Sequence, residues 1–299
     1  MRFVIVGAGS IGLLIGSYLA QHKADVTFWV RRKEQADQLR KGLVRLEETG
    51  GETIVSVRTA ETPEELPTDA LWIIAVKYDA LQSVLHRISA LPGQPDLLFI
   101  QNGMGHLALI EKLKLGNTSF ATVEHGAGRI NDRTVRHNGI GPITIAISNE
   151  KMTETVKWLE QIDPQQFPIA VQQDAEELLL RKALINCAIN PLTAILQVRN
   201  GQLIENTSFH ELFQKLSSEL LSNFPELSAI LTYEDMEAVC RKTAGNQSSM
   251  LTDRLKGNPM EIESIITAVL ERIRQKGGQA PLLDTLEKML LGLNRGDGI

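Results

Sequence analysis

The chain has little cysteine, no long apolar run and no leader-like start. Cys187 and Cys240 are its only cysteines. Two cysteines do not make a disulfide framework in a chain of 299 residues, so the sequence fits a reducing compartment. No apolar run reaches the ~18 residues of a membrane-spanning helix, and the first residues already read as a strand rather than a signal peptide. We therefore expect a cytoplasmic protein with no membrane partner.

The charge balance excludes a further class of partner. Acidic residues outnumber basic ones, 36 to 31, which gives a formal net charge of −5. Without a basic patch there is no reason to expect nucleic acid as a ligand. Internal repeats and low-complexity segments are also absent. A length of 299 residues, 43% of them hydrophobic, predicts two domains with substantial cores.

What the sequence does have is a glycine-rich turn at its start. A short apolar run over 3–6 leads into the pattern G-x-G-x-x-G and then into an apolar helical pattern. This strand–turn–helix context is what a dinucleotide-binding fingerprint requires, with the phosphates on the N–H groups that begin the helix. The predicted cofactor contacts in the turn are Gly7, Ala8, Gly9, Ser10, Ile11 and Gly12.

The end of the next predicted strand, 25–30, indicates which dinucleotide binds. An NAD-preferring fold places an acidic residue there to hold the ribose 2′-hydroxyl. This chain has Arg31, followed by Arg32 and Lys33. A guanidinium clamps a 2′-phosphate that a carboxylate would repel, so we expect Arg31 to contact the cofactor and NADPH/NADP+ to be that cofactor. The alternative is a solvated basic loop.

The first half of the chain alternates strand-like and helical segments. The apolar runs at 71–76, 97–100 and 120–123 suit parallel strands that are covered on both faces. Residues 134–139 and 143–147 predict a hairpin that extends this sheet, and 167–171 predicts one more strand. We expect an α/β Rossmann-like domain with a mostly parallel, doubly wound sheet over residues 1–170.

The second half is predicted to be all helical, over residues 171–299. Asp174, with Glu177 three residues later, is typical of a helix N-terminus and begins a long helical pattern that continues past Cys187. Glycine and proline separate the later helical segments. These segments are predicted at 208–228, 233–244, 259–276 and 281–293.

Polar residues at the predicted strand ends are candidates for a ligand site. Ligands of open parallel sheets bind outside the carboxyl ends of the strands. Lys77 follows the strand at 71–76, and Asn102, within Gln101-Asn102-Gly103, follows the strand at 97–100. Both are predicted to line the site, although residues in such places commonly do no more than cap a strand. His125 has the same position, and either site lining or a structural hydrogen bond would explain it.

The long helix of the second half carries a polar stripe. Lys182, Asn186 and Asn190 recur every four residues on a helix that is otherwise apolar. Burying a lysine and two amides costs several kcal/mol unless they are given partners. We expect the stripe to face a cleft between the domains, the alternative being a purely structural hydrogen-bonding stripe. Glu261, by contrast, reads only as an ordinary first-turn glutamate.

Taken together, these motifs give the chain, over its whole length, a resemblance to the ketopantoate reductase (2-dehydropantoate 2-reductase) family. The glycine fingerprint is common to many dinucleotide-binding proteins, whereas the segments beginning at 182 and 248 are specific to the family. The matching segments are 7–12, 76–77, 101–103, 182–194, 200–201 and 248–251 with Glu261 after it.

The resemblance implies an NADP-dependent oxidoreductase of the pantothenate and coenzyme A pathway. It would reduce 2-dehydropantoate (ketopantoate) to (R)-pantoate with NADPH and no metal, on a Rossmann-like domain and a helical domain of the 6-phosphogluconate-dehydrogenase-like type. It makes Lys182 the catalytic lysine and Glu261 its acidic partner. The residues that match cofactor or substrate contacts are Arg31, Lys77, Asn102, Asn186, Asn190 and Ser249.

Two other functions remain open at this point. One is a related NADP-dependent 2- or 3-hydroxyacid dehydrogenase with the same two-domain plan, which assays on ketopantoate and its analogues would separate. The other is a non-catalytic protein that senses NADP(H), in which the stripe containing Lys182 would be dispensable. The partner is in each case a small molecule, and the sequence leaves the assembly open, with a homodimer as one option.

Overall fold

The computed structural model describes residues 1–47, 50–147 and 149–294. The chain divides into two compact units, one made of residues 1–101 and 107–178 and the other of residues 102–106 and 179–299. These units are not continuous along the chain, and the domain limits predicted from the sequence, at 170 and 171, stay a prediction. The short segment 102–106 groups with the helical second half although it lies far from it in the sequence.

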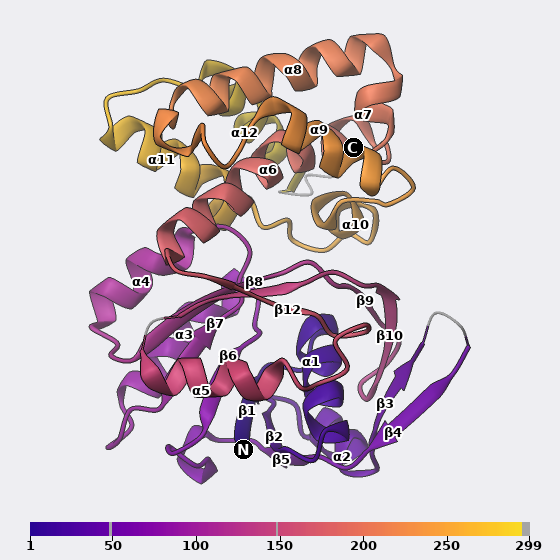
Figure 1. Ribbon diagram of the computed structural model, residues 1–299, viewed down its shortest axis with the longest axis vertical. Coiled ribbons are helices and arrows are strands. Elements are labelled where there is room, and N and C mark those ends of the chain that lie inside the picture. The colour runs from indigo at the N-terminus through magenta and orange to yellow at the C-terminus, as the bar shows by residue number, and fades with distance from the viewer. Residues whose placement is uncertain (48–49, 148, 295–299) are drawn as a thin grey trace. The chain divides into compact units, whose positions relative to one another are not determined.

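The first unit is built on an eight-stranded sheet with the order β12-β11-β8-β7-β6-β1-β2-β5 (Figure 1). Neighbouring strands pair in parallel except β8 and β11, which are antiparallel. This confirms the predicted mostly parallel sheet. The strands are β1 (Arg2–Val6), β2 (Asp25–Trp29), β5 (Arg58–Ala60), β6 (Leu71–Ile74), β7 (Asp96–Phe99), β8 (Thr118–Val123), β11 (Ile143–Ala146) and β12 (Ile169–Gln172).

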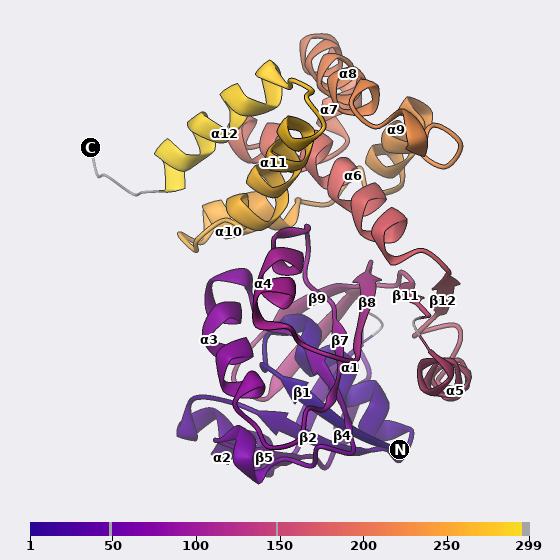
Figure 2. The same cartoon turned by 90° about the vertical axis from the view of Figure 1, so that its left-hand side faces the viewer.

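Helices cover both faces of this sheet, as a doubly wound fold requires (Figure 2). Alternate residues of β1 enter different cores: Phe3 and Ile5 pack with α1 and α5 on one face, while Val4 and Val6 belong to the core that α3 and α4 cover on the other. Helix α2 lies beyond the end of β2. The helices are α1 (Ser10–Gln21), α2 (Lys33–Arg40), α3 (Tyr78–Ser89), α4 (Gly105–Leu113) and α5 (Glu150–Leu159), with a 3₁₀ turn at Pro63–Glu65.

A second, four-stranded sheet packs on the outer side of α1, in the order β4-β3-β10-β9. Because α1 contacts strands of both sheets, it is buried all round, which explains why its sequence is apolar on every face. Gly16 is needed there, since a Cβ would lie 2.3 Å from the ring of Phe28. The strands are β3 (Leu43–Leu46), β4 (Glu52–Val55), β9 (Gly126–Arg129) and β10 (Thr134–Gly139).

The predicted hairpin over 134–147 is wrong. β10 pairs in parallel with β3 and antiparallel with β9 in the second sheet, whereas β11 joins β8 and β12 in the main sheet. The chain between them passes from one sheet to the other. At Gly141 it passes so close to Glu124 that a Cβ would lie 2.5 Å from the carbonyl oxygen of Glu124. The strand positions were predicted, but their partners were not.

The second unit consists of helices together with the segment 102–106. Its longest helix, α6, begins as predicted, because the side chain of Asp174 accepts hydrogen bonds from the N–H groups of Glu176 and Glu177. The helices are α6 (Ala175–Leu196), α7 (Gln202–Glu205), α8 (Thr207–Ser222), α9 (Tyr233–Lys242), α10 (Ser249–Leu255), α11 (Ala268–Gln275) and α12 (Pro281–Asn294), with a 3₁₀ turn at Pro225–Leu227.

One described helix, α6, is long and apolar enough to cross a membrane by length and composition alone. Within the protein, however, 72% of that apolar window is buried. Its apolar residues are therefore accounted for by the core of the helical unit.

Two predicted helices differ from the observed ones. The helix predicted over 208–228 ends at Ser222, because the chain turns before Pro225, whose ring and missing N–H do not continue a helix. The helix predicted over 259–276 starts later, with a π turn at Glu263–Thr267 (called the π segment below) followed directly by α11. Helix α11 ends before Gly277, which has φ +76°.

Candidate active site

The glycine-rich turn has the geometry that a bound pyrophosphate needs. Gly7 has φ +102°, and a Cβ there would lie 2.7 Å from Val76. A Cβ on Gly12 would lie 2.2 Å from the carbonyl oxygen of Gly7, so the start of α1 packs directly on the turn. Gly9 differs from both, because a Cβ there would meet nothing within 4 Å. The turn is therefore tightly packed on the protein side and open at Gly9.

The open side of the turn can hold an anion. Gly9 is the N-cap of α1, and among the described residues no side chain accepts a hydrogen bond at this cap. The N–H groups of the first helical turn, with the positive end of the helix dipole, are thus left for a ligand. The residues present fit the pyrophosphate of a dinucleotide.

Beyond β2, Arg31 is exposed, and within the described part of the chain no hydrogen bond or ion pair holds its guanidinium group. Arg32, the next residue, is the N-cap of α2 and forms an ion pair with Asp132. Arg31 therefore lies where the sequence placed it, with donors available to a phosphate.

The chain beyond the ends of β6 and β7 carries Lys77 and Gln101. Lys77 is the exposed N-cap of α3 and follows Val76, which abuts Gly7. Gln101 is buried, and its Nε2 donates to the carbonyl oxygens of Ile74 at 2.7 Å and of Val76 at 3.1 Å. Gln101 thus joins the ends of β6 and β7, which is a structural role, whereas Lys77 remains a candidate ligand contact.

His125 makes a buried structural hydrogen bond. Its Nδ1 lies 3.0 Å from Nε2 of His137, whose Nδ1 lies 2.9 Å from the hydroxyl of Tyr18 on α1. Burial, reinforced by the neighbouring His137, lowers the pKa of His125 to about 4, so its ring is neutral at pH 7. Nothing in the sequence pointed to His137, because it falls in the segment assigned to the hairpin.

The predicted polar stripe lies on α6 in the helical unit. Lys182 and Asn186 are half-buried, whereas Asn190 is 4% exposed. No described residue accepts a hydrogen bond from the side-chain Nδ2 of Asn190. A buried amide donor without a partner costs about 1–3 kcal/mol, so this position is suited to a ligand that supplies the acceptor.

The segment 102–106 brings Asn102 into the same unit. Gly103 has φ +77°, and a Cβ there would lie 2.0 Å from the carbonyl oxygen of Ser264, so only glycine allows this approach. The N–H of Met104 donates to the same oxygen at 2.8 Å. The backbone directly after Asn102 is therefore held against the π segment, which begins two residues after Glu261.

Helix α6 contacts the same π segment. The thiol of Cys187 lies 3.5 Å from the carbonyl oxygen of Ile265 and donates to it. Burial raises the pKa of this thiol far above its usual range, so it is not a nucleophile. The stripe on α6, the loop of Asn102 and the region of Glu261 are thus joined through one short irregular segment, and π turns of this kind are frequent at functional sites.

Hydrogen bonds join helix α10 to the C-terminal end of α6. Ser248 caps α10 by accepting from the N–H of Leu251, and its hydroxyl lies 2.7 Å from Oγ1 of Thr193. Arg254 donates to carbonyl oxygens at the end of α6. Ser249, the predicted substrate contact, is exposed beside this junction. Sequence reasoning missed the roles of Ser248 and Thr193, which only their hydrogen bonds reveal.

The predicted residues thus form two sets. Gly7 to Gly12, Arg31 and Lys77 belong to the first unit, whereas the other predicted substrate contacts and the two predicted catalytic residues belong to the helical unit. Within the described residues, no group of three or more His, Cys, Asp or Glu side chains could hold a metal ion. The helical-unit set is Asn102, Lys182, Asn186, Asn190, Ser249 and Glu261.

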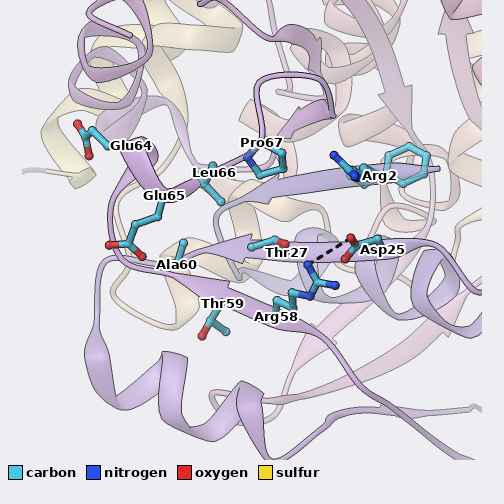
Figure 3. Close-up of a pocket in the computed structure, with 11 residues that line it drawn as sticks. Arg2, Asp25, Thr27, Arg58, Thr59, Ala60, Glu64, Glu65, Leu66 and Pro67 are labelled. Carbon is cyan, nitrogen blue, oxygen red and sulfur yellow. Dashed lines mark ion pairs between the residues drawn. The ribbon is translucent and has the colours of Figure 1, made fainter. Parts of the chain in front are cut away.

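A cavity of about 560 Å³ lies elsewhere on the first unit and is lined by none of the predicted residues (Figure 3). Arg2, Asp25 and Arg58, the first residues of β1, β2 and β5, line it. It therefore lies at the amino ends of the parallel strands, opposite the edge where such sheets bind ligands. Arg58 and Asp25 form an ion pair there at 3.4 Å.

Comparison with known proteins relates both halves of the chain to one family. The family profile "Ketopantoate reductase PanE/ApbA" matches residues 3–150, and "Ketopantoate reductase PanE/ApbA C terminal" matches residues 174–294. The chain is 37% identical to 2-dehydropantoate 2-reductase of Listeria monocytogenes, over 98% of this chain and 97% of that one. It is 34% identical to the protein of the same name from Bacillus subtilis, over 99% and 98%.

Solved structures show the same fold. The chain superposes on a probable 2-dehydropantoate 2-reductase (panE) of Bacillus subtilis with a TM-score of 0.85, at 30% identity over 98% of this chain and 100% of that one. A dimeric ketopantoate reductase of Staphylococcus aureus, 19% identical, gives a TM-score of 0.78 with complete coverage of both chains. Both family profiles and relatives at 34–37% identity cover nearly the whole chain, which therefore belongs to the ketopantoate reductase family.

Proposed function

We propose that this protein reduces 2-dehydropantoate (ketopantoate) to (R)-pantoate with NADPH, a step of pantothenate and coenzyme A biosynthesis. The observation that carries the proposal is the polar stripe on α6, joined through the π segment to the loop of Asn102 and the region of Glu261. A structural stripe would have satisfied its own hydrogen bonds, whereas the buried amide of Asn190 has an Nδ2 with no partner among the described residues.

Lys182 is the proposed general acid. NADPH supplies the hydride when it is bound. As the carbonyl carbon of the substrate accepts hydride, negative charge develops on its oxygen, and the ammonium of Lys182 stabilises that charge and donates the proton that completes the alcohol. Glu261 is the proposed acidic partner, which holds the substrate hydroxyl and balances the positive charge of Lys182.

The remaining polar residues orient the substrate. Ketopantoate is a small anion with a hydroxymethyl group, so its site needs donors for a carboxylate and an acceptor for a hydroxyl. The amide and hydroxyl groups that can do this lie on elements joined by hydrogen bonds. They belong to Asn102, Asn186, Asn190 and Ser249. Lys77, at the carboxyl edge of the sheet in the first unit, is proposed to contact cofactor and substrate.

Arg31 is the proposed basis for choosing NADPH. It is exposed at the end of β2, where an NAD-preferring protein has an acid, and no described residue pairs with it. Replacing Arg31 with Ala should raise the KM for NADPH much more than the KM for NADH, because only NADPH carries the 2′-phosphate. Equal losses for both cofactors would contradict the 2′-phosphate contact.

The direct test is NADPH oxidation by the purified protein with ketopantoate as the only added carbonyl compound. We expect rapid oxidation, with pantoate as the product, and much lower kcat/KM for 2-keto acids that lack the hydroxymethyl group. A higher kcat/KM for one of these analogues would assign the protein to a related hydroxyacid dehydrogenase. Binding of NADPH without turnover of any of them would indicate a sensor.

We also propose a cytoplasmic location and a homodimer. Both cysteines, Cys187 and Cys240, are free and buried, as expected in a reducing compartment. The Staphylococcus aureus relative is described as dimeric. Light scattering at several protein concentrations measures the assembly directly.

A further inference from the structure

The turn between β9 and β10 is fastened to the glycine-rich turn. Gln35 on α2 is buried, and its Nε2 donates to the carbonyl oxygen of Ala8 at 3.0 Å and to that of Asp132 at 3.1 Å. A single side chain therefore links the glycine turn at Ala8 to residue 132 of the second sheet. The β9–β10 turn consequently lies beside the site proposed for the cofactor.

Hydrogen bonds within this turn and to a neighbouring segment fix its backbone. The N–H of Ile130 donates to the carbonyl oxygen of Thr134 at 2.9 Å, and the N–H of Arg133 donates to the side chain of Asn131 at 3.0 Å. The guanidinium of Arg133 reaches the carbonyl oxygen of Gly42 at 3.0 Å. The side chains on the turn therefore start from a fixed backbone.

Asp132 on this turn binds two guanidinium groups at once. Its Oδ1 accepts from Nη2 of Arg32, at the start of α2, and from Nη2 of Arg129, the last residue of β9. The Nε of Arg129 donates to the carbonyl oxygen of Asn131 at 3.2 Å. Within the described residues, this leaves Nη1 of Arg32 and of Arg129 to other acceptors, and both side chains are more than a third exposed.

Folding stability does not explain so much positive charge at one place. Exposed ion pairs contribute little to the free energy of unfolding. Arg32 and Arg129 bring two positive charges to the single carboxylate of Asp132, and the exposed Arg31 directly precedes Arg32 in the chain. The excess suits a phosphate monoester, which carries about −1.5 to −2 charges at pH 7.

We propose that Arg129 is a second ligand of the cofactor's 2′-phosphate, opposite Arg31, and that Asp132 holds Arg32 and Arg129 side by side before the phosphate arrives. The proposal rests on the NADPH preference proposed above and adds a specificity-determining residue from outside the β1–α1–β2 segment. It also gives the second sheet a role in recognising the cofactor.

The test measures binding of two fragments by calorimetry, 2′,5′-ADP and 5′-AMP, which differ only by the 2′-phosphate. Arg129→Gln should weaken 2′,5′-ADP about 10–100-fold, the size of one or two charge-assisted hydrogen bonds. Binding of 5′-AMP should change less than about twofold, which also shows that the variant is folded. The affinity of Arg129→Lys for 2′,5′-ADP should lie between those of the unmodified protein and Arg129→Gln, because lysine keeps the charge but lacks the planar guanidinium.

Two further variants complete the test. Arg58→Gln is the matched control, since it removes an arginine that is also paired with an aspartate, at the opposite ends of the strands; it should leave both affinities unchanged. Asp132→Asn should weaken 2′,5′-ADP about 3–10-fold if the carboxylate positions the arginines. Tighter binding by Asp132→Asn would show that the carboxylate competes with phosphate, and would overturn its positioning role.

The outcomes separate this inference from the proposed function. If the unmodified protein binds 2′,5′-ADP no better than 5′-AMP, the NADPH preference itself is wrong. If it discriminates and Arg129→Gln discriminates equally well, or weakens both fragments alike, only the role of Arg129 is wrong. In steady-state kinetics with ketopantoate, Arg129→Gln should raise the KM for NADPH and leave the KM for NADH unchanged.

Discussion

Lys182 is the single residue on which the proposed chemistry depends most directly. Replacing it with Ala should lower kcat by about 10²–10⁴, the usual contribution of a general acid. NADPH binding should survive, because the glycine turn and Arg31 belong to the other unit. In the unmodified protein, kcat should fall at high pH as the ammonium loses its proton, and the variant should lose this alkaline limb.

The matched control is Lys215→Ala, which removes an exposed lysine from α8 of the same unit. It should change neither kcat nor the pH profile. If Lys182→Ala keeps a near-normal kcat, or keeps the alkaline limb, the proton has another source. Water would then be the next candidate, because His125 is neutral and hydrogen-bonded to His137.

Asn190 should show opposite effects on binding and on stability. Asn190→Leu removes a buried amide whose Nδ2 has no partner among the described residues, so the free energy of unfolding should stay the same or rise by up to about 1 kcal/mol. The KM for ketopantoate should rise at least tenfold. Urea unfolding and steady-state kinetics measure the two effects.

Asn200→Leu provides the contrast, because Asn200 is also buried but its side-chain Nδ2 donates to Oγ1 of Thr243 at 2.8 Å. This variant should lose stability and keep its KM. A large loss of stability in Asn190→Leu would mean that Asn190 is structural, and that the stripe on α6 serves packing more than substrate binding.

At the scale of elements, the contact between the loop at 102–106 and the π segment is the most sensitive to substitution. Gly103→Ala combines a positive φ with a Cβ 2.0 Å from a backbone oxygen, which no side-chain movement relieves. We expect it to destabilise the helical unit by about 2 kcal/mol or more. It should also raise the KM for ketopantoate by displacing Asn102, while 2′,5′-ADP binding persists.

Gly277→Ala separates the strain of a positive φ from the effect of the close Cβ contact. Gly277 has φ +76°, nearly the same as Gly103 at +77°, but a Cβ there would meet nothing within 4 Å. It should cost only the strain of the backbone conformation, about 1 kcal/mol, and leave the KM unchanged. Equal effects of the two substitutions would show that the contact with Ser264 does not position Asn102.

Elements with local signals could be predicted from the sequence, and elements defined by distant partners could not. The β1–α1 turn could be predicted because the packing leaves no room for a Cβ at Gly7 and Gly12, so the sequence shows glycine there. Helix α6 could be predicted because its start is marked by the capping residue Asp174. The strands at 134–139 and 143–147 were placed correctly but paired wrongly, since β10 takes β3 as a partner from far earlier in the chain. The residues of a strand and its neighbours in the sequence do not indicate which distant strand it pairs with.

For the whole molecule, buried histidines predict a loss of stability in mild acid. Burial lowers the pKa of His106 to about 4, and burial together with His137 lowers that of His125 to about 4, from an ordinary value of 6.5. As pH falls from about 6.5 towards 4, the unfolded chain takes up protons that the folded chain does not. The free energy of unfolding should therefore fall by about 1–2 kcal/mol per histidine between pH 7 and pH 5.

Urea unfolding at several pH values measures this dependence. His125→Phe keeps a ring against Phe167 and removes the titrating group, so its free energy of unfolding should fall less between pH 7 and pH 5 than that of the unmodified protein. His86→Gln, which removes an exposed histidine from α3, should leave the dependence unchanged. An unaltered dependence in His125→Phe would contradict the assignment to this ring.

The candidate site was only partly predictable for the same reason as the fold. Lys182, Asn186 and Asn190 could be grouped because one helix spaces them regularly. That Asn102 belongs with them depends on a contact between Gly103 and Ser264, which no spacing or composition reveals. The role inferred for Arg129 likewise depends on Asp132, which in the sequence is only one polar residue in a turn.

The contact between Met104 and Ser264 also has a consequence for biosynthesis. A ribosome adding about 5–20 residues per second takes roughly 8–30 s to make the chain between these two partners. Throughout that time the strands on either side of the loop are available to fold, while residues 102–106 wait for a surface that has not yet been made. The nascent chain thus carries a glycine-bordered loop without its packing partner until residue 264 has been made, and the site proposed at Asn102 can be completed only late in synthesis.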